Sequence, residues 1–97
     1  MLTAEKAREV SDYIIKDAIE KDTNVNIKLI EKSINDAVWL GKYNIYVRMI
    51  TDSGIHNYRV NEAVNANIYT HFTVLGFSVH FSDGGNFCSI DWGEEER

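Results

Sequence analysis

The stretch that decides the fold is FSVHFSDGGNFCSIDW, residues 77–92 of this 97-residue chain. Two runs of alternating apolar residues flank a Gly-Gly pair, a pattern typical of a β-hairpin with a primed turn. Centring the turn on Gly84 and Gly85 puts six apolar side chains on one face, in the facing pairs Phe77–Trp92, Val79–Ile90 and Phe81–Cys88. A shift of one residue would scatter them over both faces. Turn chemistry and apolar pattern therefore predict the same antiparallel hairpin.

A third strand is predicted upstream of this hairpin. Residues 43–50 alternate strictly, with Tyr43, Ile45, Val47 and Met49 on one side of the chain. This period of two is the pattern of a strand with one buried face. Residues 51–54, TDSG, form the turn that follows. Residues 55–60 fit either a short strand or the first turn of a helix.

Three helices are predicted from apolar residues spaced three and four apart. They cover residues 4–21, 27–40 and 61–75, and Thr3 is placed to cap the first. The first stripe runs through Ala7, Val10, Ile14 and Ala18. The polar run at residues 22–24 is expected to interrupt the chain, with Asn24 or Asn26 capping the second helix. Gly41 and Gly76 suit the left-handed position that closes a helix.

These elements predict an α+β fold in the order α-α-β-α-β-β. A three-stranded, mainly antiparallel sheet with the helices packed on one face would cover every apolar stripe. The length suits one domain, which we expect to span residues 1–93. Residues 94–97 are expected to form an exposed acidic tail.

Charge and cysteine content narrow the partners and the compartment. The chain has 15 acidic and 10 basic side chains, for a net charge of −5. This balance disfavours direct binding to nucleic acid or to an anionic membrane, and it suits a basic protein partner. No apolar run is long enough to span a bilayer, and the start of the chain lacks a signal-peptide core. With Cys88 as its one cysteine, the protein is expected in the cytoplasm.

The sequence offers no constellation typical of catalysis. The three histidines, His56, His71 and His80, lack the spacing of a metal site. Acidic pairs fall on solvated helix faces rather than in a cleft. The Asp83-Gly84-Gly85 segment lacks the further ligands of a calcium loop and the lysine of a phosphate-binding loop. We therefore expect a protein that is not an enzyme and holds no cofactor or metal.

Two surfaces stand out as candidates for binding. The outer face of the sheet should collect aromatic and basic side chains, as protein interfaces do. The third predicted helix carries one formal charge, at Glu62, and its non-core side is neutral, as expected of a helix covered by a partner or by a second copy of the chain. An ordinary half-covered sheet face and compositional drift remain the alternatives. The binding residues predicted from these surfaces are Tyr46, Arg48, Tyr69, Thr73, His80 and Phe87.

Short motifs resemble a group of viral proteins. The chain opens with Leu2-Thr3-Ala4-Glu5-Lys6-Ala7, has Leu75-Gly76-Phe77-Ser78-Val79 before the hairpin, and closes the hairpin with Ser89-Ile90-Asp91-Trp92-Gly93. This layout resembles small uncharacterised proteins of large tailed bacteriophages. The resemblance implies a minor virion component or a protein made during infection to bind a host factor. It transfers no functional residue.

Three hypotheses for function follow. The first is a non-enzymatic protein-interaction module that binds a protein partner, from host or virion, or its own copies through the third helix. The second is a minor structural protein of the virion, such as a capsid, neck or tail accessory. The third is an acidic inhibitor that mimics nucleic acid towards a host protein. The expected location is the host cytoplasm or the virion.

Overall fold

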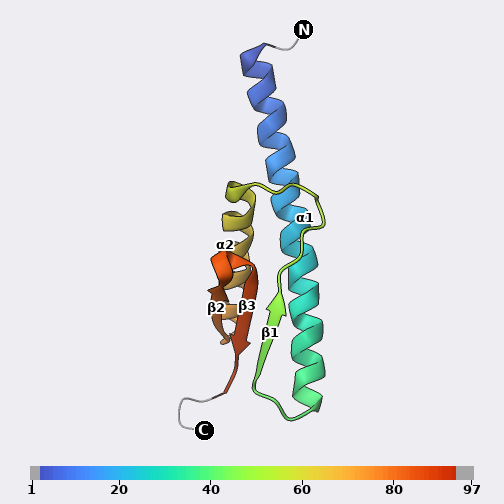
Figure 1. The fold of residues 1–97 in the computed structure, drawn as a ribbon, viewed down its shortest axis with the longest axis vertical. Coiled ribbons are helices and arrows are strands. Elements are labelled where there is room, and N and C mark those ends of the chain that lie inside the picture. Colours follow the sequence, from blue (N-terminus) through green and yellow to red (C-terminus); the bar gives the residue numbers. More distant parts are fainter. Residues whose placement is uncertain (1–2, 94–97) are drawn as a thin grey trace.

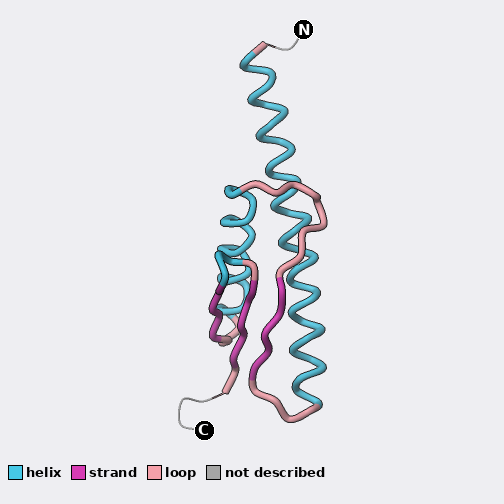
Figure 2. Tube along the Cα trace, in the orientation of Figure 1, coloured by secondary structure: helices cyan, strands magenta, loops and turns pink. Residues whose placement is uncertain are grey.

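A computed structural model describes residues 3–93, and the predicted tail 94–97 lies outside them. The described chain forms α1 (Ala4–Trp39), β1 (Asn44–Arg48), α2 (Tyr58–Val74), β2 (Ser78–Ser82), the 3₁₀ turn η1 (Asp83–Gly85) and β3 (Phe87–Asp91). The strands form one antiparallel sheet in the order β1-β3-β2 (Figures 1 and 2). The predicted α+β class with a three-stranded antiparallel sheet is confirmed.

The predicted interruption at residues 22–24 is wrong. α1 runs without a break from Ala4 to Trp39, so the two expected N-terminal helices are one (Figure 1). Asp22, Thr23 and Asn26 are all buried inside this helix. The side chains of all three bond to other parts of the fold, and the Asn26 amide also donates to the carbonyl of Asp22 within the helix at 2.8 Å. Because these bonds satisfy the buried polar groups, the helix can continue through them.

Both ends of α1 agree with the sequence. The Thr3 hydroxyl accepts a hydrogen bond from the backbone N–H of Lys6 at 3.1 Å, which satisfies one of the free donors of the first turn. At the other end Gly41 has φ +73°, and the N–H of Lys42 donates to the carbonyl of Ala37 at 3.0 Å. A glycine in the left-handed region closes the helix here, as predicted.

The hairpin has the predicted register. Val79 faces Ile90 and Phe81 faces Cys88, and the rings of Phe77 and Trp92 meet edge to face at 6.0 Å. Gly84 and Gly85 both have positive φ, as a primed turn requires. Turn chemistry and apolar pattern gave the same register because both are local properties of this segment.

The core lies between the two helices and one face of the sheet. α2 begins at Tyr58 after the Asn57 cap, which makes residues 58–60 helical and leaves 55–57 as loop. Its buried side chains meet the inner face of the strands. The buried apolar residues are Ala18, Ile30, Ala37, Ile45, Val60, Val64, Ile68, Phe72, Val79, Cys88 and Ile90. Burial of a large side chain of this kind contributes roughly 1.5–3 kcal/mol.

The first part of α1 projects beyond the rest of the molecule (Figure 1). The structure is 61 Å long and 23 Å by 21 Å across. Every side chain from residue 4 to residue 14 is exposed, and burial begins at Ile15. We call residues 4–14 the arm. The expectation that all apolar stripes are covered is wrong for Ala7, Val10 and Ile14, because neither the sheet nor α2 extends far enough to reach them.

In the described part of the chain, no helix is both long and apolar enough to cross a membrane.

Candidate functional site

The outer face of the sheet carries an aromatic pair. The rings of Tyr46 on β1 and Phe87 on β3 stack at 5.1 Å with an angle of 3° between their planes. The Tyr46 hydroxyl reaches across β3 to the Ser82 hydroxyl on β2, at 3.2 Å. Tyr46 nevertheless stays 63% exposed. The pair therefore forms an exposed aromatic surface, and its contacts also link the three strands.

Arg48 and His80 lie on the same outer face as this pair. The register places Arg48 opposite Phe87 and His80 opposite Ser89, and both side chains are exposed. The structure thus brings together four of the six predicted binding residues: Tyr46, Arg48, His80 and Phe87. Their role in binding stays a prediction.

The other two predicted residues lie elsewhere. Tyr69 and Thr73 are on α2, which packs on the opposite face of the sheet. The Thr73 hydroxyl donates to the carbonyl of Tyr69 at 2.7 Å, so this group already bonds within its own helix. The Tyr69 ring is 51% exposed. The six predicted residues therefore lie on two separate surfaces, the outer sheet face and α2, from which they were predicted.

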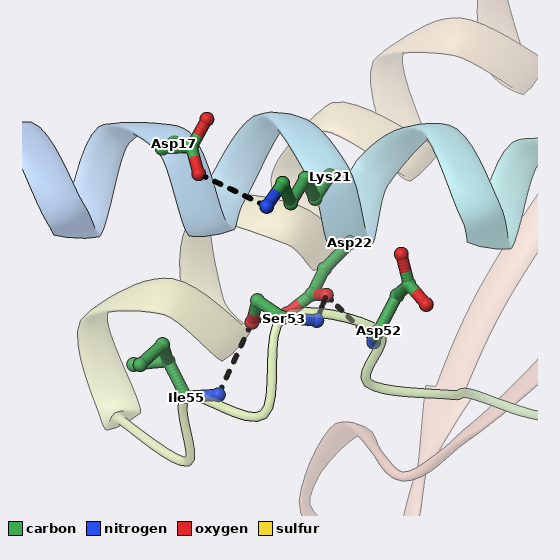
Figure 3. A network of polar contacts seen from close by, with 6 residues as sticks. All are labelled: Asp17, Lys21, Asp22, Asp52, Ser53 and Ile55. Carbon is green, nitrogen blue, oxygen red and sulfur yellow. Dashed lines mark hydrogen bonds and ion pairs between the residues drawn. The ribbon is translucent and has the colours of Figure 1, made fainter.

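The most enclosed polar cluster is one that the sequence did not reveal. The Asp22 carboxylate accepts hydrogen bonds from the backbone N–H groups of Asp52 and Ser53, both at 2.8 Å, and from the Ser53 hydroxyl at 2.9 Å (Figure 3). Next to Asp22 in the sequence, Lys21 forms an ion pair with Asp17 at 3.4 Å on the surface of α1. Asp22 thus holds the loop between β1 and α2 against the middle of α1.

Asn26, one turn further along α1, holds the same loop, and we call Asp22 and Asn26 the polar anchor. Its side-chain amide donates to the carbonyl of Ile50 at 2.8 Å and accepts from the N–H of Ile50 at 2.9 Å. Thr23, between them, accepts from the Asn67 amide of α2 at 3.2 Å. Their signal in the sequence was polarity at the centre of a helical stripe, which we interpreted as a break.

A polar cavity of about 250 Å³ opens beside this anchor. It lies between α1, the loop after β1, α2 and the hairpin turn, and Arg48, His56 and Asn65 are among the residues that line it. The most buried polar side chains that line it, those of Asp22 and Asn26, already bond to the loop. Asp22 and Asn26 therefore have a structural role at this cavity, because they hold the loop in place.

Two kinds of group that could carry chemistry remain: the Cys88 thiol and the side chains able to bind a metal ion. Cys88 is fully buried on β3, and burial raises the pKa of its thiol to about 11. A thiol with this pKa is almost entirely protonated at neutral pH and is a weak nucleophile. Within residues 3–93, no group of three or more His, Cys, Asp or Glu side chains is arranged to hold a metal ion.

The arm and the opposite end of the helices expose apolar side chains. On the arm, Val10 is 44%, Tyr13 69% and Ile14 45% exposed. At the far end Trp39 is 82% exposed, and exposed apolar side chains also occur at Val38, Leu40, Tyr43, Val74 and Leu75. Sequence reasoning missed both surfaces, because the apolar spacing of a helix does not reveal where the rest of the fold ends.

Comparisons with protein-family models, with curated proteins and with solved structures gave no match. The resemblance to bacteriophage proteins therefore stays a prediction.

Proposed function

We propose that this protein is a non-enzymatic protein-interaction module and that the arm is its main contact surface. The observation that carries the proposal is the uncovered apolar stripe of the arm, formed by Ala7, Val10 and Ile14. A helix exposed on all sides normally carries polar residues all round. Here the three-and-four spacing of a buried helix continues where nothing of the described chain covers it.

The energetics of the arm support binding. Its residues 4–14 span roughly 16 Å at 1.5 Å per residue. Isolated helices of this length are marginal in water, because tertiary packing supplies most helical stability. The arm is held by its continuation into the packed part of α1 and by the Thr3 cap. A partner that covers the stripe would add the packing that the arm lacks.

The chemistry of the stripe indicates the kind of partner. Val10 and Ile14 lie one helical turn apart, and the Tyr13 ring extends the apolar surface beside them. Apolar anchors spaced in this way are the features by which a helix binds an apolar groove or a second helix. Charged residues of both signs border the stripe, with Lys6 and Glu9 paired at 3.5 Å. We infer a partner with an apolar groove or helix face and mixed charges around it.

The test is a double variant, Val10→Glu with Ile14→Glu. Both side chains are exposed, so the variant should fold, and circular dichroism should be unchanged. Lys16→Glu, an exposed position on the other side of the same helix, is the control for added negative charge. Sedimentation measures self-association, and affinity capture followed by quantitative mass spectrometry compares what each variant retains.

We expect the native chain and Lys16→Glu to retain the same stoichiometric partner, or to associate with themselves, and the double variant to lose it. A native chain that stays monomeric and captures the same proteins as the double variant would contradict the proposal.

A further inference from the structure

The strand β1 lies at an edge of the sheet with one side unpaired. Pairing with β3 uses the odd-numbered positions, since the N–H of Met49 donates to Asn86 and the carbonyl of Tyr43 accepts from Trp92. Backbone groups alternate in direction along an antiparallel strand. The N–H and C=O groups that point away from β3 therefore belong to Asn44, Tyr46 and Arg48. No hydrogen bond within residues 3–93 occupies them.

The next outward-pointing residue shows what this edge can bind. At Ile50 both backbone groups are taken by the Asn26 amide, which donates to the carbonyl and accepts from the N–H. A side-chain amide has the same donor and acceptor as a peptide group. At Ile50, the Asn26 amide thus makes the pair of hydrogen bonds that a neighbouring strand would make at every second residue. The unpaired edge of β1 faces α1. The Asn26 amide shows that an amide group between β1 and α1 can bond to this edge.

The unpaired section of the edge borders a groove. This groove has a volume of about 670 Å³, and its two sides are β1 and the C-terminal part of α1. The helix side includes Ala37, a small residue of the core that is only 5% exposed, and Leu40, which is 71% exposed. Figure 1 shows α1 running beside the edge of β1 that faces away from β3. An extended segment lying here would bond to β1 and place alternate side chains against α1.

We propose that an extended segment of a partner polypeptide adds to β1 as a fourth strand, between β1 and α1. This site lies at the edge of β1 and not on the arm, so it rests on the proposed function only in that the protein binds polypeptides. Five residues of extended chain span roughly 17 Å, the length of β1. Side chains of the segment on the helix side would lie against the exposed Leu40, so apolar residues fit there.

The charge of Arg48 indicates which residues suit the side of the segment that lies on the outer face of the sheet. These side chains would lie beside Tyr46 and Arg48 on the outer face. The Arg48 guanidinium forms no ion pair in the described chain. An acidic side chain next to it would gain a charge-assisted hydrogen bond. The partner segment is therefore one that alternates apolar and acidic residues.

A single segment fits this edge better than a second copy of the chain. Pairing β1 with β1 of another molecule would bring two α1 helices to the same gap, because α1 already lies along this edge in each copy. A lone extended segment carries no such helix. Self-pairing of β1 is nevertheless a distinct outcome that the experiment can detect.

The experiment titrates the full chain with a blocked hexapeptide of alternating valine and glutamate, and follows backbone amides by NMR. We expect the amides of Asn44, Tyr46 and Arg48 to shift and to gain protection from hydrogen exchange. A hexapeptide of alternating valine and lysine should bind about tenfold more weakly. Protection of these amides that rises with protein concentration in the absence of peptide would overturn the proposal in favour of a second copy.

Two variants test the geometry. Asn44→Pro removes an outward N–H that makes no bond to β3, which an edge strand tolerates, and it should weaken binding about tenfold. Arg48→Glu should reverse the preference from the glutamate peptide to the lysine peptide, and it covers the case in which the proline variant fails to fold. Unchanged binding by both variants would overturn the proposal.

The arm variant separates the two proposals. Val10→Glu with Ile14→Glu should bind the hexapeptide like the native chain, because the arm is remote from the groove. Loss of peptide binding in this variant would contradict the assignment of the peptide to β1. If the double variant binds the peptide normally and also captures the same partner as the native chain, the proposed function of the arm is rejected. The proposal of strand addition at β1 is then unaffected.

Discussion

The two parts of α1 obey the same local rules and meet different surroundings. Residues 4–14 and residues 15–39 both have helical apolar spacing, and the helix passes from one to the other without a break. In the first part every side chain is exposed, whereas Ile30 in the second is fully buried. Packing, and not helix formation, distinguishes them. Apolar residues in the packed part stabilise this fold, and those in the arm are available to another molecule.

The largest difference should appear when isoleucine is shortened in each part. Ile30→Ala should lower the free energy of unfolding by about 2–5 kcal/mol, because it leaves a cavity in the core. Ile14→Ala should change it by less than about 0.5 kcal/mol, since this side chain is 45% exposed and alanine favours helix. Urea denaturation of the two variants measures both. Equal losses would show that the arm is packed in solution.

The same comparison with asparagine tests the polar anchor. Asn26→Ala leaves the N–H and C=O of Ile50 without their partner, which should cost about 1–3 kcal/mol. Asn24→Ala, two positions earlier and exposed, should stay within about 0.5 kcal/mol of the native chain. Chemical denaturation reads out both. A neutral Asn26→Ala variant would mean that the loop after β1 does not depend on α1.

Thiol chemistry compares the core with the arm in one molecule. In a Ser11→Cys variant the introduced thiol is on the exposed arm, where an ordinary thiol pKa near 9 is expected. Cys88 is buried, and its pKa is raised to about 11. At pH 8 the arm thiol should react with an aromatic disulfide reagent at least tenfold faster, roughly in proportion to its larger thiolate fraction and its access. Two equal rates would place Cys88 outside the core.

The raised pKa of Cys88 also sets the sign of a pH effect. The unfolded thiol ionises near pH 9, whereas the folded thiol stays protonated up to about pH 11. Stability from this group is therefore fully present below pH 9 and is lost as the pH rises towards 11. The free energy of unfolding should fall less steeply over this interval in Cys88→Ala than in the native chain.

The smallest global effect is expected at the tip of the arm. Thr3→Ala removes the acceptor for the N–H of Lys6, a change that costs about 1 kcal/mol in an isolated helix. Because the arm can fray without unfolding the core, the midpoint of global unfolding should not move. Hydrogen exchange should become faster at residues 5–8 only. A shifted midpoint would mean that the arm and the core unfold together.

Local signals explain what was predictable. The hairpin register, the strand β1 and the glycine that ends α1 each follow from residues close together in the chain. The shared outer face of Tyr46 and Phe87 was predictable for the same reason, because strand alternation fixes the side on which each residue lies. Their stacking at 5.1 Å depends on the pairing of β1 with β3, which is not local.

The candidate site was only partly predictable, and for a related reason. Tyr69 and Thr73 were predicted on a helix surface separate from the outer sheet face, and both residues lie on α2, on the other side of the sheet. Asp22 and Asn26 were interpreted as helix breakers, because polar residues in a helical stripe usually favour caps and turns. Their partners at residues 50–53 are 24 to 31 positions away in the chain and could not be identified from local sequence.

The sequence by itself determined the class of fold, the hairpin with its register and the alternation of the first strand, since each depends on side-chain periodicity and turn chemistry within a few residues. Only the tertiary structure decided that α1 is continuous, that its first three turns stand uncovered and that the edge of β1 opens into a groove. Those features depend on where separate elements meet and where they end. Hydrogen bonds between distant residues and the reach of the sheet decide such questions, and neither has a local signature.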